Sequence, residues 1–281
     1  MSPQSVTIAL GEYDTGWHSP EASLAAATRV ATHAAAFGAR LVVLPEMATT
    51  GFTMETDRAV PLESRDVSLL RAIASRLGIW VVAGVALRET DADGAACAHN
   101  AALAIDPNGE IVAIHRKQRM FAFAGEEASY RAGRESTIVT IEGVRFGLFI
   151  CYELRFAELF ADVAADVSGM IVIANWPAPR RAHWDALLRA RAIENQCAVV
   201  GVNRTGTAGG LTYDGGSVAF DAWGDRIDPA TPAGLRIVTI DAAKVAAVRE
   251  RFPFLRDRRL PEDHGGVGDM ALRAFVAADR I

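Results

Sequence analysis

A cysteine stands where a predicted strand gives way to a predicted helix. Residues 146–150 form a continuous apolar run, and after Cys151 the apolar residues Leu154, Leu159 and Phe160 follow helical spacing. Backbone N–H groups at a helix N-terminus lower the pKa of a thiol and can also hold a developing oxyanion. Cys151 could therefore act as a nucleophile, although a cysteine taken alone is more often a buried core residue.

Two charged residues also follow predicted strands. Glu46 comes after the apolar run 41–44 and after Pro45, which cannot donate to a strand ladder. A carboxylate beside such apolar sequence is poorly solvated, which would raise its pKa and suit a general base; a turn or capping acid is the alternative. Lys117 follows the run 111–114, inside a basic segment that is more typical of a solvated surface. The three residues form one candidate constellation, although their spacing does not show that they meet.

The segments around these residues alternate between predicted helices and predicted strands, which favours an α/β fold. Residues 101–105 and 111–114 form a predicted hairpin, because the Asp-Pro-Asn-Gly sequence between them supplies the turn geometry. The sheet is therefore not purely parallel. Helical spacing covers residues 21–37, 69–77, 183–194 and 242–251, and further strands are predicted at residues 6–10, 41–44, 79–85, 146–150, 170–173, 197–202, 217–220 and 235–240.

A second turn repeats the pattern of the first. Residues 221–224 place Asp and Gly at the same spacing as residues 106–109, and each turn follows a predicted strand. This repeat predicts two similar halves packed sheet on sheet. The Gly-rich segment 206–210 has neither GxGxxG nor GxxxxGK[ST] spacing, so we predict a mobile loop there and no phosphate site.

The overall composition argues against several classes of protein. The 281 residues carry 29 Lys and Arg against 34 Asp and Glu, so the net charge of −5 offers no footprint for nucleic acid or an anionic membrane. No apolar run reaches the length of a membrane span and no signal core follows Met1, so we expect a cytoplasmic protein. Cys97, Cys151 and Cys197 form no CxxC pair, and the six histidines have no HxxxH or HExxH spacing, so we expect neither disulfides nor a metal.

The order of these residues and their flanking motifs resemble the nitrilase, or carbon–nitrogen hydrolase, superfamily. The resemblance covers residues 5–255, and within the superfamily the chain looks most like the bacterial ω-amidases, chiefly through residues 121–133 and the segment Asn175-Trp176-Pro177. The motifs that carry it are Leu44-Pro45-Glu46-Met47, His115-Arg116-Lys117, Cys151-Tyr152-Glu153-Leu154-Arg155-Phe156, Asn175-Trp176-Pro177-Ala178-Pro179-Arg180, His183-Trp184, Arg189-Ala190-Arg191-Ala192-Ile193-Glu194-Asn195 and Asn203-Arg204.

The resemblance implies a four-layer α-β-β-α sandwich that dimerises through its helical layers. Residues 1–255 would form the hydrolase domain, and residues 256–281 would form a C-terminal tail that packs at a subunit interface. The superfamily needs no metal or organic cofactor.

The resemblance also implies a Glu-Lys-Cys triad, which Glu46, Lys117 and Cys151 would supply. A further active-site glutamate is expected seven residues before Gly133, which selects Glu126. Glu127, beside it, is the alternative. Glu153, two residues after Cys151, stands where relatives often carry Asp. His115 and His183 are interpreted as structural residues.

The implied reaction is hydrolysis of the terminal amide of a small 2-oxo acid, such as 2-oxoglutaramate or 2-oxosuccinamate, to the acid and ammonia. Glu46 would take the proton of the Cys151 thiol, and the thiol sulfur would attack the amide carbon. The Lys117 ammonium and the backbone N–H of Tyr152 would hold the oxyanion, and a thioester would follow. Glu126 would orient the substrate or Lys117.

Three residues are candidates for substrate binding. Arg155 is the partner that the resemblance implies for the substrate carboxylate, because a planar guanidinium binds carboxylates well. An ion pair between Arg155 and a carboxylate such as Glu158 is the alternative. Phe52 and Trp176 are candidates for apolar pocket walls, although aromatic residues at strand ends more often belong to the core.

Other functions stay open at this point. A nitrilase or an N-carbamoyl amino acid hydrolase would use the same three residues. A catalytically silent binding or scaffold protein could keep the same fold, because fold does not determine function. Acyl transfer to an amine would need an acceptor site and often a membrane segment, and the sequence offers no such segment.

Overall fold

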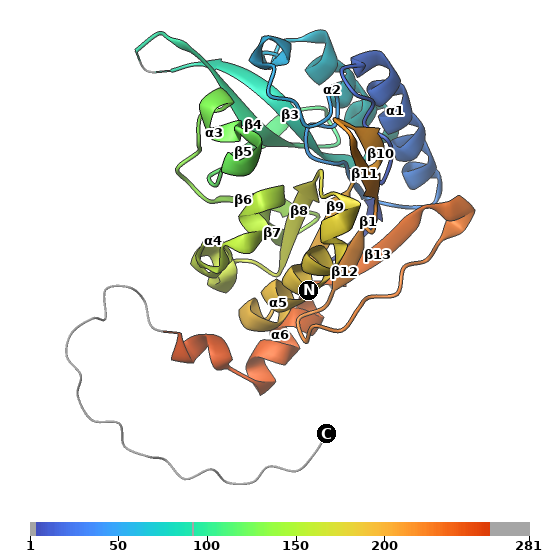
Figure 1. Ribbon diagram of the computed structural model, residues 1–281. Coiled ribbons are helices and arrows are strands. Elements are labelled where there is room, and N and C mark those ends of the chain that lie inside the picture. The colour runs from blue at the N-terminus through green and yellow to red at the C-terminus, as the bar shows by residue number, and fades with distance from the viewer. Residues whose placement is uncertain (1–3, 92, 259–281) are drawn as a thin grey trace, which may run out of the picture.

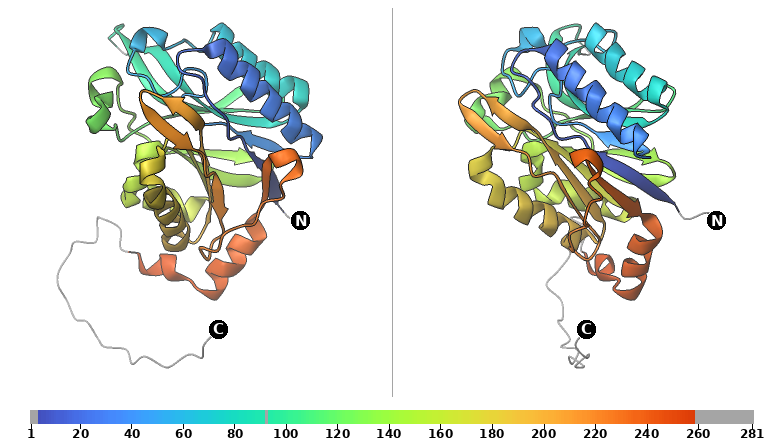
Figure 2. Two further views of the ribbon diagram at one scale, coloured as in Figure 1. Left: turned by 45° about the vertical axis from the view of Figure 1, so that its right-hand side comes forward. Right: turned by 90° about the vertical axis from the view of Figure 1, so that its right-hand side faces the viewer.

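Two β-sheets lie face to face in the computed structural model, which describes residues 4–91 and 93–258 (Figure 1). Successive side chains on a strand point to opposite faces, so each strand contributes to two layers. The layer between the sheets buries branched and aromatic residues such as Ile8, Phe146 and Val200. Both outer faces are covered by helices, and the four layers are visible in Figure 2. The predicted α-β-β-α sandwich is confirmed.

The first sheet has six strands in the order β13-β1-β2-β3-β4-β5, with β1, β2 and β3 parallel and the other pairs antiparallel. Helices α1 (Pro20–Ala36) and α2 (Arg65–Leu77) cover its outer face, where Ala31 and Leu70 pack beside Val42. The strands are β1 (Ser5–Leu10), β2 (Leu41–Val43), β3 (Trp80–Thr90), β4 (Ala96–Ile105), β5 (Ile111–Arg116) and β13 (Arg236–Asp241).

The second sheet has five strands in the order β12-β9-β8-β7-β6, with β7, β8 and β9 parallel. Its outer face packs against helices through Phe160, Trp184 and Val245. The described helices include none long and apolar enough to cross a bilayer. The elements are β6 (Thr137–Ile141), β7 (Val144–Ile150), β8 (Gly169–Ala174), β9 (Ala198–Asn203) and β12 (Val218–Phe220), with α4 (Ala157–Val163), α5 (Arg181–Asn195) and α6 (Ala242–Arg251).

The two Asp-x-x-Gly turns share the same hydrogen bonds. Asp106 Oδ1 accepts from two backbone N–H groups two and four residues later, and Asp221 Oδ1 does the same. The first turn joins β4 to β5. After the second turn the chain pairs with β12 only through an isolated bridge between Phe220 and Arg226. The two turns therefore have the same structure, but the second turn is followed by a single bridge and not by a full paired strand.

Several predicted boundaries change in the structure. The Gly-rich segment 206–210 is not a mobile loop, because β10 (Thr205–Ala208) pairs with β11 (Leu211–Asp214) and Gly209-Gly210 forms the turn between them. Helix α2 starts earlier than predicted because the Ser64 hydroxyl caps its first turn through the N–H of Val67. Strand β6 and the short helix α3 (Glu126–Ser129) were not predicted.

The predicted C-terminal tail, residues 256–281, lies outside the described residues beyond Arg258. Arg258 itself donates to the carbonyl of Glu194 at 2.7 Å, at the end of α5.

Gly84 on β3 allows the chain that leaves β2 to lie directly against it. A Cβ atom at position 84 would be 2.5 Å from Glu46 Cα and 2.5 Å from Met47 N. The Gly84 N–H donates to the Pro45 carbonyl at 3.1 Å, and the Gly84 carbonyl accepts from Ala48 N at 2.8 Å. The position of Glu46 therefore requires a residue without a side chain at position 84.

We predict that Gly84→Ala lowers the free energy of unfolding by about 3 kcal/mol, the upper end of typical overpacking costs, because both opposing atoms belong to the backbone. Urea unfolding of the purified protein measures this loss. Gly38→Ala is the control, since Gly38 has φ +81° but open space around it; its left-handed backbone should cost only about 1 kcal/mol. Equal losses in the two variants would contradict the steric explanation.

Candidate active site

Glu46 lies just beyond β2 and is completely buried. Its Oε1 accepts from Asn100 Nδ2 at 2.7 Å and from Lys117 Nζ at 3.0 Å, and its Oε2 accepts from the backbone N–H of Asn175 at 2.9 Å. Burial alone raises the pKa of Glu46, but the Lys117 charge and these hydrogen bonds bring it below its usual value. The expectation of a raised pKa is wrong, because the apolar flanking sequence does not reveal these partners.

Lys117 directly follows β5 and is completely buried. The basic segment around Lys117 suggests a solvated surface, and for Lys117 this prediction is wrong. Its Nζ donates to Glu46 Oε1 at 3.0 Å and to Glu126 Oε2 at 2.8 Å. Burial alone lowers the pKa of Lys117, but the two carboxylates raise it above its usual value, so the amine is an ammonium.

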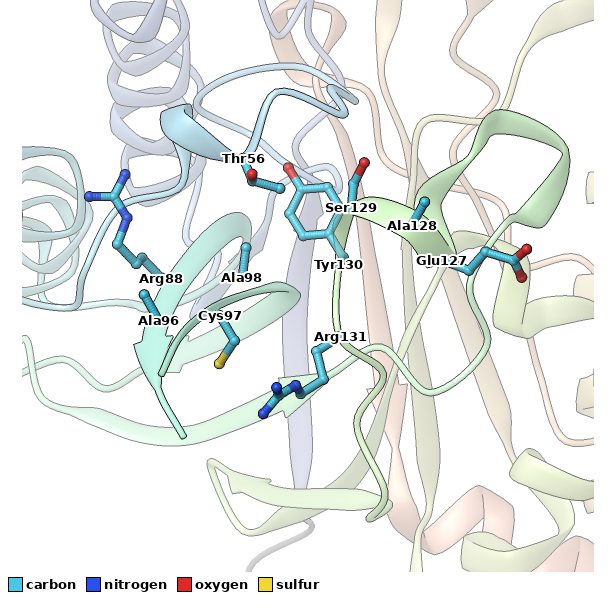
Figure 3. Close-up of a pocket in the computed structure, with 10 residues that line it drawn as sticks. All are labelled: Thr56, Arg88, Ala96, Cys97, Ala98, Glu127, Ala128, Ser129, Tyr130 and Arg131. Atoms are coloured by element: carbon cyan, nitrogen blue, oxygen red, sulfur yellow. The ribbon is translucent and has the colours of Figure 1, made fainter. Parts of the chain in front are cut away.

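Glu126, at the start of α3, is the glutamate that joins this cluster. Its carboxylate is buried and accepts from Asn100 Nδ2 at 2.8 Å and from the backbone N–H of Phe121 at 2.7 Å, in addition to Lys117. Glu127 points elsewhere and lines a separate hollow (Figure 3). The structure therefore brings Glu126, and not Glu127, to Lys117.

Cys151 opens a short 3-10 helix, η3 (Cys151–Arg155), directly after β7, so the predicted strand-to-helix turn is confirmed. Its φ of +48° lies in the left-handed region, which costs a non-glycine residue of order 1–3 kcal/mol. Burial raises the pKa of Cys151 well above its usual value, and the Glu46 carboxylate raises it further against the opposing effect of Lys117. The expectation of a lowered thiol pKa is wrong, because one short helical turn does not outweigh burial beside two carboxylates.

Glu153 ties the Cys151 turn to the Lys117 segment. Its buried carboxylate accepts from the backbone N–H of Ile150 at 2.6 Å and of Gln118 at 2.6 Å. His115 Nε2 lies 3.0 Å from the same carboxylate, and both side chains are fully buried. This arrangement agrees with the structural interpretation of His115 and gives Glu153 a positioning role that the sequence did not indicate.

A cavity of about 830 Å³ adjoins Lys117 and Cys151. Both predicted wall residues line it: the Phe52 ring lies 5.4 Å from Lys117 Nζ, and the Trp176 indole donates to the Arg180 carbonyl at 2.8 Å. Most of the wall is apolar. The larger lining side chains are Trp17, Phe52, Met54, Phe121, Phe123, Tyr152, Arg155, Trp176, Arg180, Leu211 and Tyr213.

Two arginines reach this cavity. The Arg155 guanidinium lies 5.0 Å from the Trp176 ring centroid and 3.3 Å from His183 Nδ1. Glu158, the alternative partner, lies instead 3.6 Å from Arg119. Arg155 is thus available to the cavity, and Arg180 lines the same wall.

Sequence reasoning missed four residues of the site. Asn175 and Arg180 stand in a motif that was identified, and the asparagine after β8 could have been suspected from its place at a strand end. Asn100, within β4, and Tyr213, on β11, gave no signal, because nothing local distinguishes them from other strand residues.

A second hollow, of about 500 Å³, lies between β4 and the segment after Glu126 (Figure 3). It is lined by Cys97, Arg88 and Arg131 among others and contains none of the four clustered residues. Across residues 4–91 and 93–258, no group of three or more His, Cys, Asp or Glu side chains is placed to hold a metal ion.

Known proteins resemble this chain in both sequence and fold. The family model for carbon-nitrogen hydrolases matches residues 7–250. The chain is 38% identical to an omega-amidase of Yersinia enterocolitica over 77% of this chain and 83% of the relative. It is 33% identical to a 2-oxoglutaramate amidase of Bacillus subtilis over 79% and 85% of the two chains.

Among solved structures, a CN-hydrolase superfamily protein of Xanthomonas campestris, with an arsenic adduct in its active site, superposes with a TM-score of 0.81. It is 33% identical, and the match covers 96% of this chain and 99% of that one. The family match spans both sheets and every residue of the buried cluster. The chain therefore belongs to the carbon–nitrogen hydrolase family and is an amidase-type enzyme of that family.

Proposed function

We propose that this enzyme hydrolyses the terminal amide of a small 2-oxo dicarboxylic acid monoamide, such as 2-oxoglutaramate or 2-oxosuccinamate, through a thioester on Cys151. The observation that carries the proposal is the buried contact of Lys117 with Glu46 and Glu126 beside the Cys151 thiol, at one end of a cavity. The relatives named omega-amidase and 2-oxoglutaramate amidase support the choice of substrate.

The ionisation of the site favours attack by a neutral thiol with a carboxylate as its base. Glu46 is ionised and the Cys151 thiol is protonated at neutral pH, as the directions of their pKa shifts require. As the sulfur attacks the amide carbon, its proton passes to Glu46. The oxyanion that forms is stabilised by the Lys117 ammonium and by the backbone N–H of Tyr152.

Glu46 then returns the proton to the amide nitrogen, ammonia leaves, and the acyl group remains on Cys151 as a thioester. Glu46 next takes a proton from a water molecule, whose oxygen attacks the thioester. The second tetrahedral intermediate collapses to the carboxylic acid, and the departing thiolate recovers its proton from Glu46. Lys117 keeps its charge throughout, because Glu126 holds it at 2.8 Å.

Arg155 is the proposed partner for the carboxylate at the other end of the substrate. It lines the cavity next to Trp176, and a guanidinium can bind a carboxylate with two hydrogen bonds. Phe52 and Trp176 would pack against the methylene groups. The substrate would thus be held by charge at one end and by apolar walls along its length.

The predicted homodimer and the cytoplasmic location also stay proposals. An aromatic cluster near α5 supports the dimer: Trp223 is 44% exposed and Phe254 57% exposed, and both rings pack beside Phe252 at 4.8 and 5.8 Å. Such exposed aromatic residues are typical of interfaces. The molar mass in solution would decide the oligomeric state.

The proposed reaction is tested by ammonia release from 2-oxoglutaramate, with glutamine, a nitrile and an N-carbamoyl amino acid as comparison substrates. We expect release from the 2-oxo acid amide, and a fall of about 10⁴-fold or more in Cys151→Ala because the nucleophile is removed. Turnover of the nitrile alone, or of the N-carbamoyl amino acid alone, would show instead that the enzyme is a nitrilase or an N-carbamoyl amino acid hydrolase. No turnover of any of the four would favour a scaffold role.

The two neighbouring glutamates offer a matched pair of variants. Glu126→Gln keeps the shape of the side chain but removes one of the two charges that hold Lys117, so we expect kcat to fall by about 100-fold. Glu127→Gln should leave kcat unchanged, because Glu127 is exposed and lines the second hollow, away from Lys117. Steady-state kinetics measure both, and similar effects in the two variants would contradict the assignment of Glu126.

The pH dependence follows from the lowered pKa of Glu46. The base must be ionised, so kcat/KM should stay level as the pH falls from about 7 and should decline only below 4.5, the ordinary value for a glutamate. A pH–rate profile checks this, with circular dichroism at each pH to show that the protein stays folded. A half-loss of activity near about pH 6 in folded protein would show that a group other than an ionised Glu46 limits the reaction.

A further inference from the structure

Tyr213 on β11 forms part of the wall of the active-site cavity and is only 6% exposed. Its ring lies 4.7 Å from the guanidinium of Arg204, which is completely buried and pairs with Asp14. The backbone of Tyr213 is paired with that of Gly206 in the β10–β11 hairpin. The ring is therefore held in one place.

The Tyr213 hydroxyl differs from the other buried tyrosine hydroxyls. Tyr13 donates to the Ala48 carbonyl at 3.0 Å, and Tyr130 donates to the Thr53 carbonyl at 2.9 Å. Among the described residues the Tyr213 hydroxyl has no such partner. Of the three tyrosine hydroxyls, it is therefore the one with a hydrogen bond left to offer to a ligand atom in the largely apolar cavity that Tyr213 lines.

The surroundings of this hydroxyl identify it as a neutral donor. Burial raises the pKa of Tyr213 to about 12, against the opposing effect of Arg204. Tyr213 lines the same cavity as Lys117, Cys151 and Arg180. At neutral pH the group therefore keeps its proton and can donate a hydrogen bond to an acceptor oxygen.

We propose that the Tyr213 hydroxyl donates a hydrogen bond to the 2-oxo oxygen of the substrate and thereby selects 2-oxo acid amides over amides that lack this group. The inference rests on the proposed function and deepens it. In 2-oxoglutaramate the 2-oxo carbon stands between the amide and the carboxylate. With the amide at Cys151 and the carboxylate at Arg155, the 2-oxo oxygen is the acceptor left for a donor on the cavity wall.

The same contact explains how glutamine would be rejected. Glutamine carries an ammonium group where the 2-oxo acid carries a carbonyl oxygen. An ammonium group has three N–H donors and no acceptor, so it cannot accept the Tyr213 O–H. It can donate only one N–H to the phenolic oxygen, which leaves the O–H and two further N–H donors without acceptors on this wall.

The test compares 2-oxoglutaramate with glutaramate, which has the same amide and carboxylate but no 2-oxo group. In Tyr213→Phe, kcat/KM should fall about tenfold for 2-oxoglutaramate and by less than about twofold for glutaramate, because only the first substrate loses a hydrogen bond. Both substrates are measured on the same enzyme preparation. A partly unfolded variant would lower both values equally and leave their ratio unchanged.

Two further variants serve as controls. Tyr13→Phe removes a buried hydroxyl outside the cavity and should leave the ratio of the two kcat/KM values at its wild-type level. Arg155→Ala should lower both values by a similar factor, since both substrates carry the carboxylate.

The outcomes separate this inference from the proposed function. An equal fall for both substrates in Tyr213→Phe, or no fall for either, overturns the role of Tyr213. If the wild-type enzyme hydrolyses both substrates without preference, the role of Tyr213 is likewise overturned, but the amidase reaction stands. Wild-type enzyme that releases no ammonia from 2-oxoglutaramate overturns the proposed function, and the selectivity of Tyr213 with it.

Discussion

The buried ammonium of Lys117, held between the carboxylates of Glu46 and Glu126, is the interaction on which the site depends. Two buried carboxylates that share Asn100 would repel each other without a cation between them. Removing one member of such a buried ionic group typically costs about 3–5 kcal/mol, because the remaining charge is left uncompensated. The cluster as a whole carries one negative charge in excess. Burial, and then this excess of negative charge, holds the pKa of the neighbouring Cys151 thiol well above its usual value.

The fold holds this cluster in place from several directions. Met47 has a φ of +43° and Cys151 a φ of +48°, so the chain turns sharply as it leaves β2 and again as it leaves β7. Each turn is held by neighbours that do not react: Gly84 allows close backbone contact at the first, and the Glu153 carboxylate binds backbone N–H groups at the second. Strained backbone of this kind persists only where the surrounding structure compensates for it.

The apolar periodicity of the sequence predicted most strands and long helices, and the residues at the strand ends pointed to Glu46 and Cys151. What it could not predict was the environment of those residues. The basic segment around Lys117 has the composition of a surface, yet Lys117 is completely buried, because its partners come from segments 71 and 9 residues away. The pKa shifts of Glu46 and Cys151 were predicted in the wrong direction for the same reason. Tyr213 was missed because its role depends on a hairpin that closes over a distant cavity.

The pairing of β13 with β1 makes the first sheet depend on both ends of the described chain, since Val6 lies opposite Ile240. On the ribosome, the strand that closes this sheet emerges only after the second sheet and all its parallel strands have been made. Until then the edge of β1 is open, and an open edge of a hydrophobic strand readily pairs with other chains. Completion of the sandwich is therefore a late event in synthesis, and the nascent protein depends for a time on whatever shields that edge.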